Sequence, residues 1–144
     1  MQPPRNPNEV QKLTGMMAAL NRFISRSAER CRPFFLLLHK WKEFQWSEEC
    51  VTTFQELKCY LSHPPIMYRP VVDEVLFAYL AVALHAISLV LIRMDNGIQR
   101  PVYYVSKSFN EAEVCYLPLE KAILAIVHAT RKLPHYFQTH TTVV

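Results

Sequence analysis

The sequence predicts an α+β protein, in which N-terminal short helices are followed by antiparallel strands packed on a helix. Three observations support this fold class. Residues 6–62 place apolar side chains at helical spacing, residues 75–108 are rich in strand-forming residues around one Asn-Gly turn, and residues 118–133 have a regular helical pattern. Because 51% of the 144 residues are apolar and 19% are charged, the chain can bury a core.

Three short helices are predicted in residues 1–62. Asn6 can cap the first, which we expect to reach residue 24. Its apolar stripe is Val10, Leu13, Met17, Leu20 and Ile24. A second helix begins at Ser27, and a third begins at Ser47 and stops before the His-Pro-Pro of residues 63–65. The stripe of the third is Cys50, Phe54, Leu57 and Leu61.

Residues 75–92 carry no charge and allow two interpretations, a membrane span or two buried strands. A spanning helix needs about 20 apolar residues, so the run is at the low limit. The run is rich in β-branched residues, and His85-Ala86 offers a place to bend. Asn96-Gly97 is a strong turn signal before the strand-like segment RPVYYVSKS. We therefore predict strands here and no membrane partner.

The C-terminal part predicts a helix and the start of a fourth strand. Ser108 and Glu111 have the spacing of a capping box. The helix over residues 118–133 has an apolar side formed by Leu119, Ile123, Ile126 or Val127, Thr130 and Leu133. The last segment, THTTVV, is rich in strand-forming residues and predicts the start of a truncated strand.

Composition excludes several kinds of site. Two glycines in the whole chain exclude glycine-rich phosphate loops and dinucleotide-binding fingerprints. The four cysteines form no CxxC pair and no cluster with histidine, and the N-terminus lacks the apolar run of a secretory signal. We therefore expect an intracellular protein with reduced cysteines.

The excess of positive charge lies entirely in the first half. Residues 1–70 contain ten Lys and Arg against six Asp and Glu, whereas residues 71–144 contain six of each. The candidate nucleic-acid-binding residues are Arg22, Arg26, Arg30, Arg32, Lys40 and Lys42. They fit sequence-independent contacts with phosphates, and the alternative is a solvated helix face.

Five segments resemble the pol polyprotein of gypsy-type LTR retrotransposons, especially plant elements. They are EVQKLTGMMAALNRFISRSAERCRPFFLLL, FQWSEECVTTFQELKCYLSHPP, RPVYYVSKSFNEAE, YLPLEKAILAIVHATRKLPHYF and THTTVV. The resemblance implies that residues 1–66 are the C-terminal thumb or connection part of a reverse transcriptase and that residues 67–144 are a truncated, partial RNase H-like domain. The polymerase palm would lie upstream of Met1.

The resemblance also implies where RNase H acids would lie. Active relatives use carboxylates to hold two Mg²⁺ ions. The first-strand aspartate corresponds to Ala81, the helix glutamate corresponds to Ala122, and the third acid would follow Val144. Other acids of the second half have no spacing that suggests a shared metal site. We therefore expect no catalytic residues, no metal site and no cofactor.

The expected function is that of a degenerate RNase H-like domain in a reverse transcriptase region. It would serve as a structural tether or nucleic-acid-positioning module of the parent polyprotein, with an RNA–DNA hybrid and other pol domains as partners. Two alternatives stay open. One is an active or partner-completed RNase H that hydrolyses the RNA strand of hybrids, and the other is an interaction module retained by a host.

Overall fold

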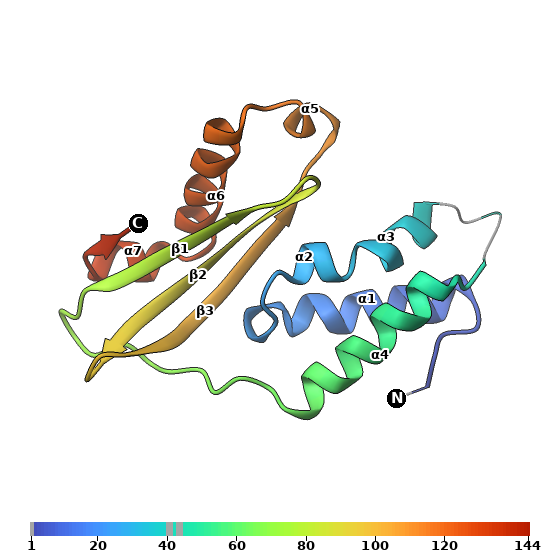
Figure 1. Cartoon of the computed structure of the whole chain (residues 1–144), viewed down its shortest axis with the longest axis horizontal. Coiled ribbons are helices and arrows are strands. Elements are labelled where there is room, and N and C mark those ends of the chain that lie inside the picture. Colours follow the sequence, from blue (N-terminus) through green and yellow to red (C-terminus); the bar gives the residue numbers. More distant parts are fainter. Residues whose placement is uncertain (1, 40–41, 43–44) are drawn as a thin grey trace.

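The computed structural model describes residues 2–39, 42 and 45–144. Its N-terminal part is helical and its C-terminal part contains a sheet with helices (Figure 1). The helical elements of the first part are α1 (Pro7–Ala19), the short 3₁₀ helix η1 (Asn21–Phe23), α2 (Ser27–Arg30), α3 (Arg32–His39) and α4 (Glu48–Ser62). The second part comprises β1 (Leu76–Val82), β2 (Ala86–Asp95), β3 (Ile98–Ser108), α5 (Glu111–Val114), α6 (Pro118–Lys132), α7 (Pro134–Thr139) and β4 (Thr142–Val143).

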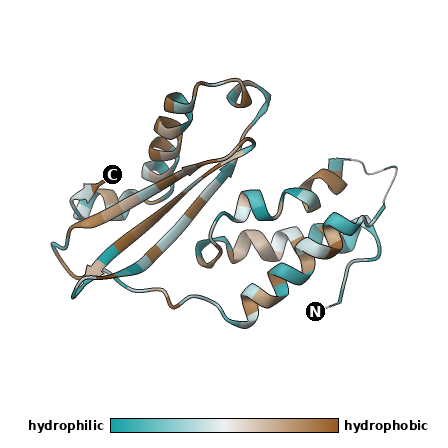
Figure 2. Ribbon diagram, in the orientation of Figure 1, coloured by the Kyte–Doolittle hydropathy of each residue, from teal (hydrophilic) through white to brown (hydrophobic). Residues whose placement is uncertain are grey.

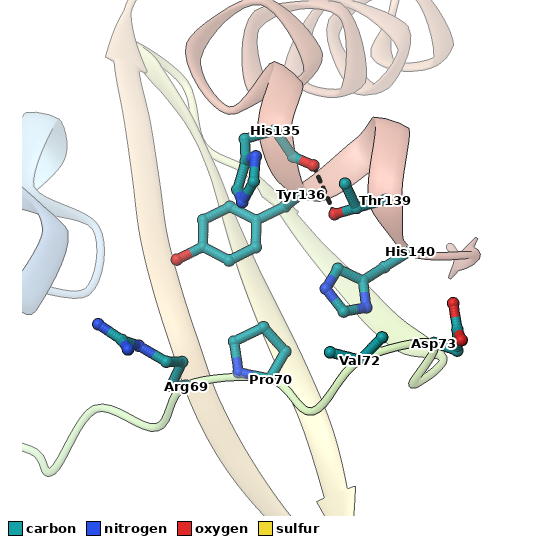
Figure 3. Close-up of a pocket in the computed structure, with 8 residues that line it drawn as sticks. All are labelled: Arg69, Pro70, Val72, Asp73, His135, Tyr136, Thr139 and His140. Atoms are coloured by element: carbon teal, nitrogen blue, oxygen red, sulfur yellow. Dashed lines mark hydrogen bonds between the residues drawn. The ribbon is translucent and has the colours of Figure 1, made fainter.

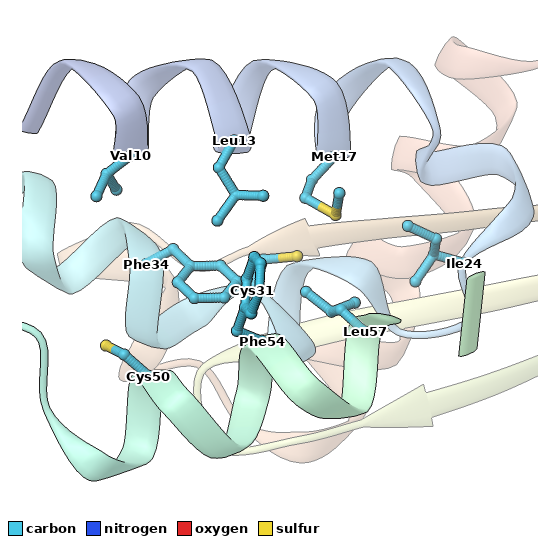
Figure 4. Packing of buried hydrophobic residues seen from close by; sticks show 9 residues of the cluster. All are labelled: Val10, Leu13, Met17, Ile24, Cys31, Phe34, Cys50, Phe54 and Leu57. Atoms are coloured by element: carbon cyan, nitrogen blue, oxygen red, sulfur yellow. The ribbon is translucent and has the colours of Figure 1, made fainter. Parts of the chain in front are cut away.

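The helical part, residues 7–62, encloses a core of its own (Figure 4). Its buried residues are Val10, Leu13, Met17, Ile24, Cys31, Phe34, Cys50, Phe54 and Leu57. The predicted stripes of the first and third helices supply most of this set. Phe34 is completely buried and stacks on Trp46, with 5.7 Å between ring centroids. Burial raises the pKa of the Cys31 thiol to about 11, against a weaker opposing effect of Arg30, so this cysteine is a packing residue.

Two of the predicted helices are shorter than expected. The first ends at Ala19, and the chain continues through η1 to Arg26, whose φ of 53° is incompatible with a right-handed helix. The second is divided at Cys31 into α2 and α3. Pro33 explains this division, because it has no N–H to donate to the carbonyl of Glu29 in a continuous helix.

The apolar run of residues 75–92 forms strands, as predicted. β1 and β2 are antiparallel, and Ala83–His85 connect them. Asn96 and Gly97 both have positive φ, 50° and 80°, as expected for the tight turn between β2 and β3. Figure 2 shows hydrophobic residues along β1 and most of β2. No helix within the described residues is long and apolar enough to cross a membrane.

The described strands form one sheet with the order β3-β2-β1-β4. β2 pairs antiparallel with β1 and β3, whereas β4 lies parallel to β1, with Leu76 opposite Thr142. The predicted final strand is therefore present as a short edge strand. The α+β class is confirmed, with antiparallel strands packed on a helix.

α6 packs against one face of the sheet through small side chains. The core at this face contains Leu76, Ala78, Leu89, Leu91, Val102, Val105, Ala129 and Leu133. The prediction for the apolar side of this helix was wrong at Leu119 and Ile123, which are 72% and 52% exposed, and right at Leu133, which is buried. Ala125 and Ala129 are buried instead, because alanine lets a helix approach the sheet closely.

The predicted capping box was also misplaced. Ser108 is still part of β3, so its backbone is committed to the sheet. The cap is Asn110, whose side chain accepts a hydrogen bond from the N–H of Glu113, while the Glu113 carboxylate accepts from the N–H of Asn110. The sequence spacing of three residues is the same, but it begins two residues later.

The other face of the sheet meets the helical part at β3. The Ser106 hydroxyl lies 2.6 Å from the Ser27 hydroxyl and accepts from the N–H of Ala28 at 2.9 Å. Figure 1 shows α6 on one side of the sheet and the N-terminal helices on the other. The predicted boundary between domains, residues 1–66 and 67–144, stays a prediction.

Candidate nucleic-acid interface

Three of the predicted basic residues line one hollow of the surface. Arg26, Arg30 and Arg32 share it with the β1–β2 hairpin at residues 83–85, and its volume is about 470 Å³. Arg26 precedes α2 and Arg30 ends it, and the Arg30 N–H donates to the Arg26 carbonyl at 3.0 Å. This hydrogen bond closes one turn of the chain, and the two arginines line the same hollow. Arg32 follows at the start of α3.

Acidic side chains line the same hollow. Glu29, Glu49 and Glu56 balance the formal charge of the three arginines. Within the part of the chain that the structure describes, none of these arginines has a carboxylate oxygen within 4.0 Å. The guanidinium of Arg30 instead lies over the ring of Tyr60, 4.7 Å from its centroid. Among the described residues, the guanidinium groups of the hollow therefore form no ion pair, although acidic side chains line the same hollow.

The remaining predicted basic residues lie elsewhere. The Arg22 guanidinium lies between the rings of Phe23 and Tyr103, 5.0 and 4.9 Å from their centroids, and its Nε is buried without a hydrogen-bond partner. This arrangement attaches η1 to β3, so the contacts of Arg22 are structural. Lys42 is an exposed turn residue that does not line the hollow. Lys40 lies outside the described residues.

A slot adjoins the hollow over the sheet face that looks away from α6. Ala81 and Ser88 are directly opposite each other on β1 and β2, and both line the slot. Tyr79, Tyr104, Ser25 and Arg26 are among its other lining residues. Arg26 lines both the slot and the hollow, so the two are neighbours.

Sequence analysis did not single out the two tyrosines of this slot. Their signal is period-two alternation, because Tyr79 and Ala81 share one face of β1 and Tyr104 is opposite Val90 on β2. Burial raises the pKa of the Tyr104 hydroxyl, the neighbouring Tyr60 adds to this, and Arg30 opposes it. Tyr104 therefore keeps its proton at neutral pH and can donate a hydrogen bond.

Ala81 and Ala122, which the sequence resemblance places at the positions of family acids, are on different sides of the sheet. Ala81 faces the slot, whereas Ala122 belongs to α6, which packs on the opposite face. Neither methyl side chain has a donor atom, so these residues do not fit a divalent cation. Among residues 2–39, 42 and 45–144, no group of three or more His, Cys, Asp or Glu side chains could hold a metal ion.

A larger hollow, about 750 Å³, lies between the connector before β1 and α7 (Figure 3). The residues that line it are Arg69, Pro70, Val72, Asp73, His135, Tyr136, Thr139 and His140. Two of its polar side chains are engaged in local structure. His140 Nδ1 lies 2.9 Å from the Glu74 carbonyl oxygen, and the Thr139 hydroxyl donates to the His135 carbonyl at 2.7 Å. These contacts attach α7 to the connector.

The amino-acid sequence matches a family of known proteins over most of its length. The model of the RNase H-like domain found in reverse transcriptase matches residues 46–144. The chain is 29% identical to the retrovirus-related Pol polyprotein from transposon opus of Drosophila melanogaster, over 94% of the chain and 15% of that protein. It is 27% identical to the corresponding polyprotein from Drosophila transposon 297, over 92% of the chain and 12% of that protein.

Solved structures have the same fold. The foamy viral protease-reverse transcriptase in complex with double-stranded DNA superposes with a TM-score of 0.78 at 21% identity, over 93% of this chain and 28% of that one. The same viral protein in complex with an RNA/DNA hybrid superposes with a TM-score of 0.76, over 92% of this chain and 18% of that one. The chain thus spans a small part, between 12% and 28%, of the relatives named here.

Proposed function

This chain belongs to the family of RNase H-like domains found in reverse transcriptase, and from this premise we propose that it positions an RNA–DNA hybrid without cleaving it. It would do so inside a retroelement Pol polyprotein, where it also tethers the polymerase to other Pol domains. The element would be of the gypsy type and similar to those of plants. The convergence of Arg26, Arg30 and Arg32 in one hollow is the observation that carries this proposal.

Phosphate contacts suit the chemistry of this hollow. A guanidinium group remains charged at all physiological pH values and matches the geometry of phosphate oxygens. Contacts with the backbone give affinity and position but no sequence preference, and they weaken steeply as salt rises. The three nearby glutamates oppose a polyanion, so the proposed affinity is moderate and depends on how the arginines extend past them.

The lack of cleavage in the proposal follows from the residues at the family acid positions. RNase H chemistry needs ligands that hold divalent cations against the scissile phosphate. Ala81 and Ala122 provide no oxygen for this, and they lie on opposite sides of the sheet. The chain is therefore proposed to bind a hybrid and leave its RNA strand intact.

Salt-dependent binding of a fluorescein-labelled RNA–DNA hybrid tests the proposal. The triple variant Arg26→Gln, Arg30→Gln and Arg32→Gln should reduce the slope of log K against log salt by about 3, since each lost phosphate contact removes about 0.9. The control carries Arg5→Gln, Arg131→Gln and Lys132→Gln, which removes the same charge from exposed positions elsewhere. An equal reduction of this slope in both variants would contradict the proposal.

Cleavage of the same hybrid is measured in parallel. We expect the RNA strand to stay intact both in the presence of Mg²⁺ and in the presence of EDTA. Degradation that requires Mg²⁺ and is lost in Asp73→Ala or Glu120→Ala would instead support an active RNase H. Glu120 accepts a hydrogen bond from the N–H of Leu117 at 2.8 Å, so its role in the present account is to cap α6.

A further inference from the structure

The slot beside the arginine hollow has the size and the lining of a site for one flat ring. Its volume is about 220 Å³. Ala81 and Ser88 leave it open, because these two small residues are opposite each other where larger side chains would meet. Tyr79 and Tyr104 are its aromatic lining residues, from β1 and β3.

Tyr79 is exposed and makes one side-chain hydrogen bond to a residue of β3. Its side chain is 50% exposed, and its hydroxyl accepts a hydrogen bond from Gln99 Nε2 at 2.9 Å. An aromatic ring on an open sheet face offers a stacking surface for a second ring. Such stacking tolerates any base, because every nucleobase has a flat π face.

The polar groups of the slot suit the edge of a base and the phosphate attached to it. Ser25, Ser88 and Tyr104 line the slot, and their hydroxyl groups can donate and accept hydrogen bonds. Arg26 lines both the slot and the arginine hollow, where Arg30 also lies. A base in the slot would therefore have its own backbone phosphate next to two guanidinium groups.

We infer that this slot receives an unpaired nucleobase of a single-stranded nucleic acid, whose neighbouring phosphate contacts Arg26 and Arg30. A base inside a duplex cannot enter, because its partner and its stacked neighbours cover its edge and both of its faces. The inference rests on the proposed function in that it uses the same arginines. It adds a second kind of ligand, the unpaired end or flanking strand of a template.

The test compares single-stranded and hybrid oligonucleotides on the same variants. Ala81→Leu fills the slot, and Ala112→Leu is the matched control at an exposed position of α5. Ala81→Leu should weaken binding of a fluorescein-labelled single-stranded 12-mer at least tenfold, while the affinity for an RNA–DNA hybrid changes less than twofold. Ala112→Leu should change neither. Thermal unfolding of each variant verifies that it is folded.

A second pair of variants tests stacking without added bulk. Tyr79→Ala should weaken single-strand binding about as much as Ala81→Leu, and Tyr79→Phe should restore it because the ring remains. A 2-aminopurine in the single strand should lose fluorescence on binding to the wild type and keep it with Tyr79→Ala.

The outcomes separate the inference from the proposed function. Unchanged single-strand affinity in both Ala81→Leu and Tyr79→Ala would overturn the inference, even if hybrid binding depends on the arginines. Single-strand binding that depends on Ala81 and Tyr79 without any hybrid binding would support the slot and refute the proposed function.

Discussion

The helical part and the sheet part of this molecule use their apolar residues differently. In the helical part the predicted stripe is the buried one, with Val10 and Met17 0% and 3% exposed. In the sheet part the first half of the stripe predicted for α6 faces solvent, with Leu119 and Ile123 72% and 52% exposed, and only its end at Leu133 is buried. The two helices have comparable sequence patterns, so the pattern alone did not determine which side is buried.

The partner of each helix explains the difference. α1, α3 and α4 pack on one another, and large side chains fill the space between cylinders. α6 packs on a broad sheet whose strands already supply large residues such as Leu89 and Leu91. Alanines then give the closest approach, and Leu119, Ile123 and Val127 are placed on the outer side of α6. A helix that packs on a sheet can thus bury the face that carries its small side chains.

The largest effect is expected in the helical core. Phe34→Ala should lower the free energy of unfolding by about 3–5 kcal/mol, because it removes a completely buried ring that stacks on Trp46. Its neighbour Phe35 is 38% exposed, so Phe35→Ala is a matched control that should cost much less. Urea denaturation measures both. Similar costs at the two positions would show that the helical core is packed in another way.

The next largest change in stability is expected on the side of α6 that packs on the sheet. Ala129 is completely buried, so Ala129→Leu should destabilise the protein by about 1–3 kcal/mol through overpacking. Ile123→Ala removes a larger group from an exposed position and should change stability by about 0.5 kcal/mol or less. If Ile123→Ala proves the more damaging change in urea denaturation, the predicted stripe is the buried one after all.

The ion pair at the start of α5 should give a smaller effect that depends on pH. Burial opposes the ionisation of Glu113, but hydrogen bonds from Lys107 and the Asn110 N–H, with the charges of Lys107 and His128, lower its pKa below the ordinary 4.5. A carboxyl with a lowered pKa stabilises the fold above about pH 4.5, and this contribution is lost as pH falls through the folded-state pKa.

Glu113→Gln isolates this contribution. The variant should be less stable than the wild type at pH 7, and the difference should shrink as the pH falls below 4.5. Lys107 Nζ lies 2.7 Å from Glu113 Oε2, so Lys107→Met should show the same trend. Urea denaturation at several pH values measures it. A difference that stays constant down to pH 2 would contradict the assigned cause.

No gain of activity is expected from restoring the family acids. The double variant Ala81→Asp and Ala122→Glu should leave the RNA of an RNA–DNA hybrid intact in Mg²⁺, because the two positions lie on opposite sides of the sheet. A denaturing gel of end-labelled RNA measures this. Cleavage that disappears in EDTA would mean that the two side chains do meet and that the sheet faces are assigned wrongly.

Much of the fold could be predicted from local pattern. The Asn-Gly turn, the strand-forming residues beside it and Pro118 at the start of α6 all act through nearby backbone geometry. The division of the second helix at Cys31 was missed, although Pro33 was visible in the sequence. The orientation of α6 could not be predicted in this way, because it depends on the side chains of strands far away in sequence.

The candidate site was predictable only in part. Arg26 and Arg30 were selected for their spacing of four, but only the fold shows that Arg32 joins them beside the β1–β2 hairpin. Arg22 has the same spacing, and yet it lies between two aromatic rings at β3. The slot tyrosines, Tyr79 and Tyr104, are on strands that become neighbours only through β2.

Hydrogen–deuterium exchange with and without a bound RNA–DNA hybrid tests the central claim most directly, since it maps the contact surface on the unmodified chain. We expect slower exchange at residues 25–32 and at the hairpin residues 83–85, which border the arginine hollow. Protection confined to residues 69–73 and 135–140, around the larger hollow, would contradict it.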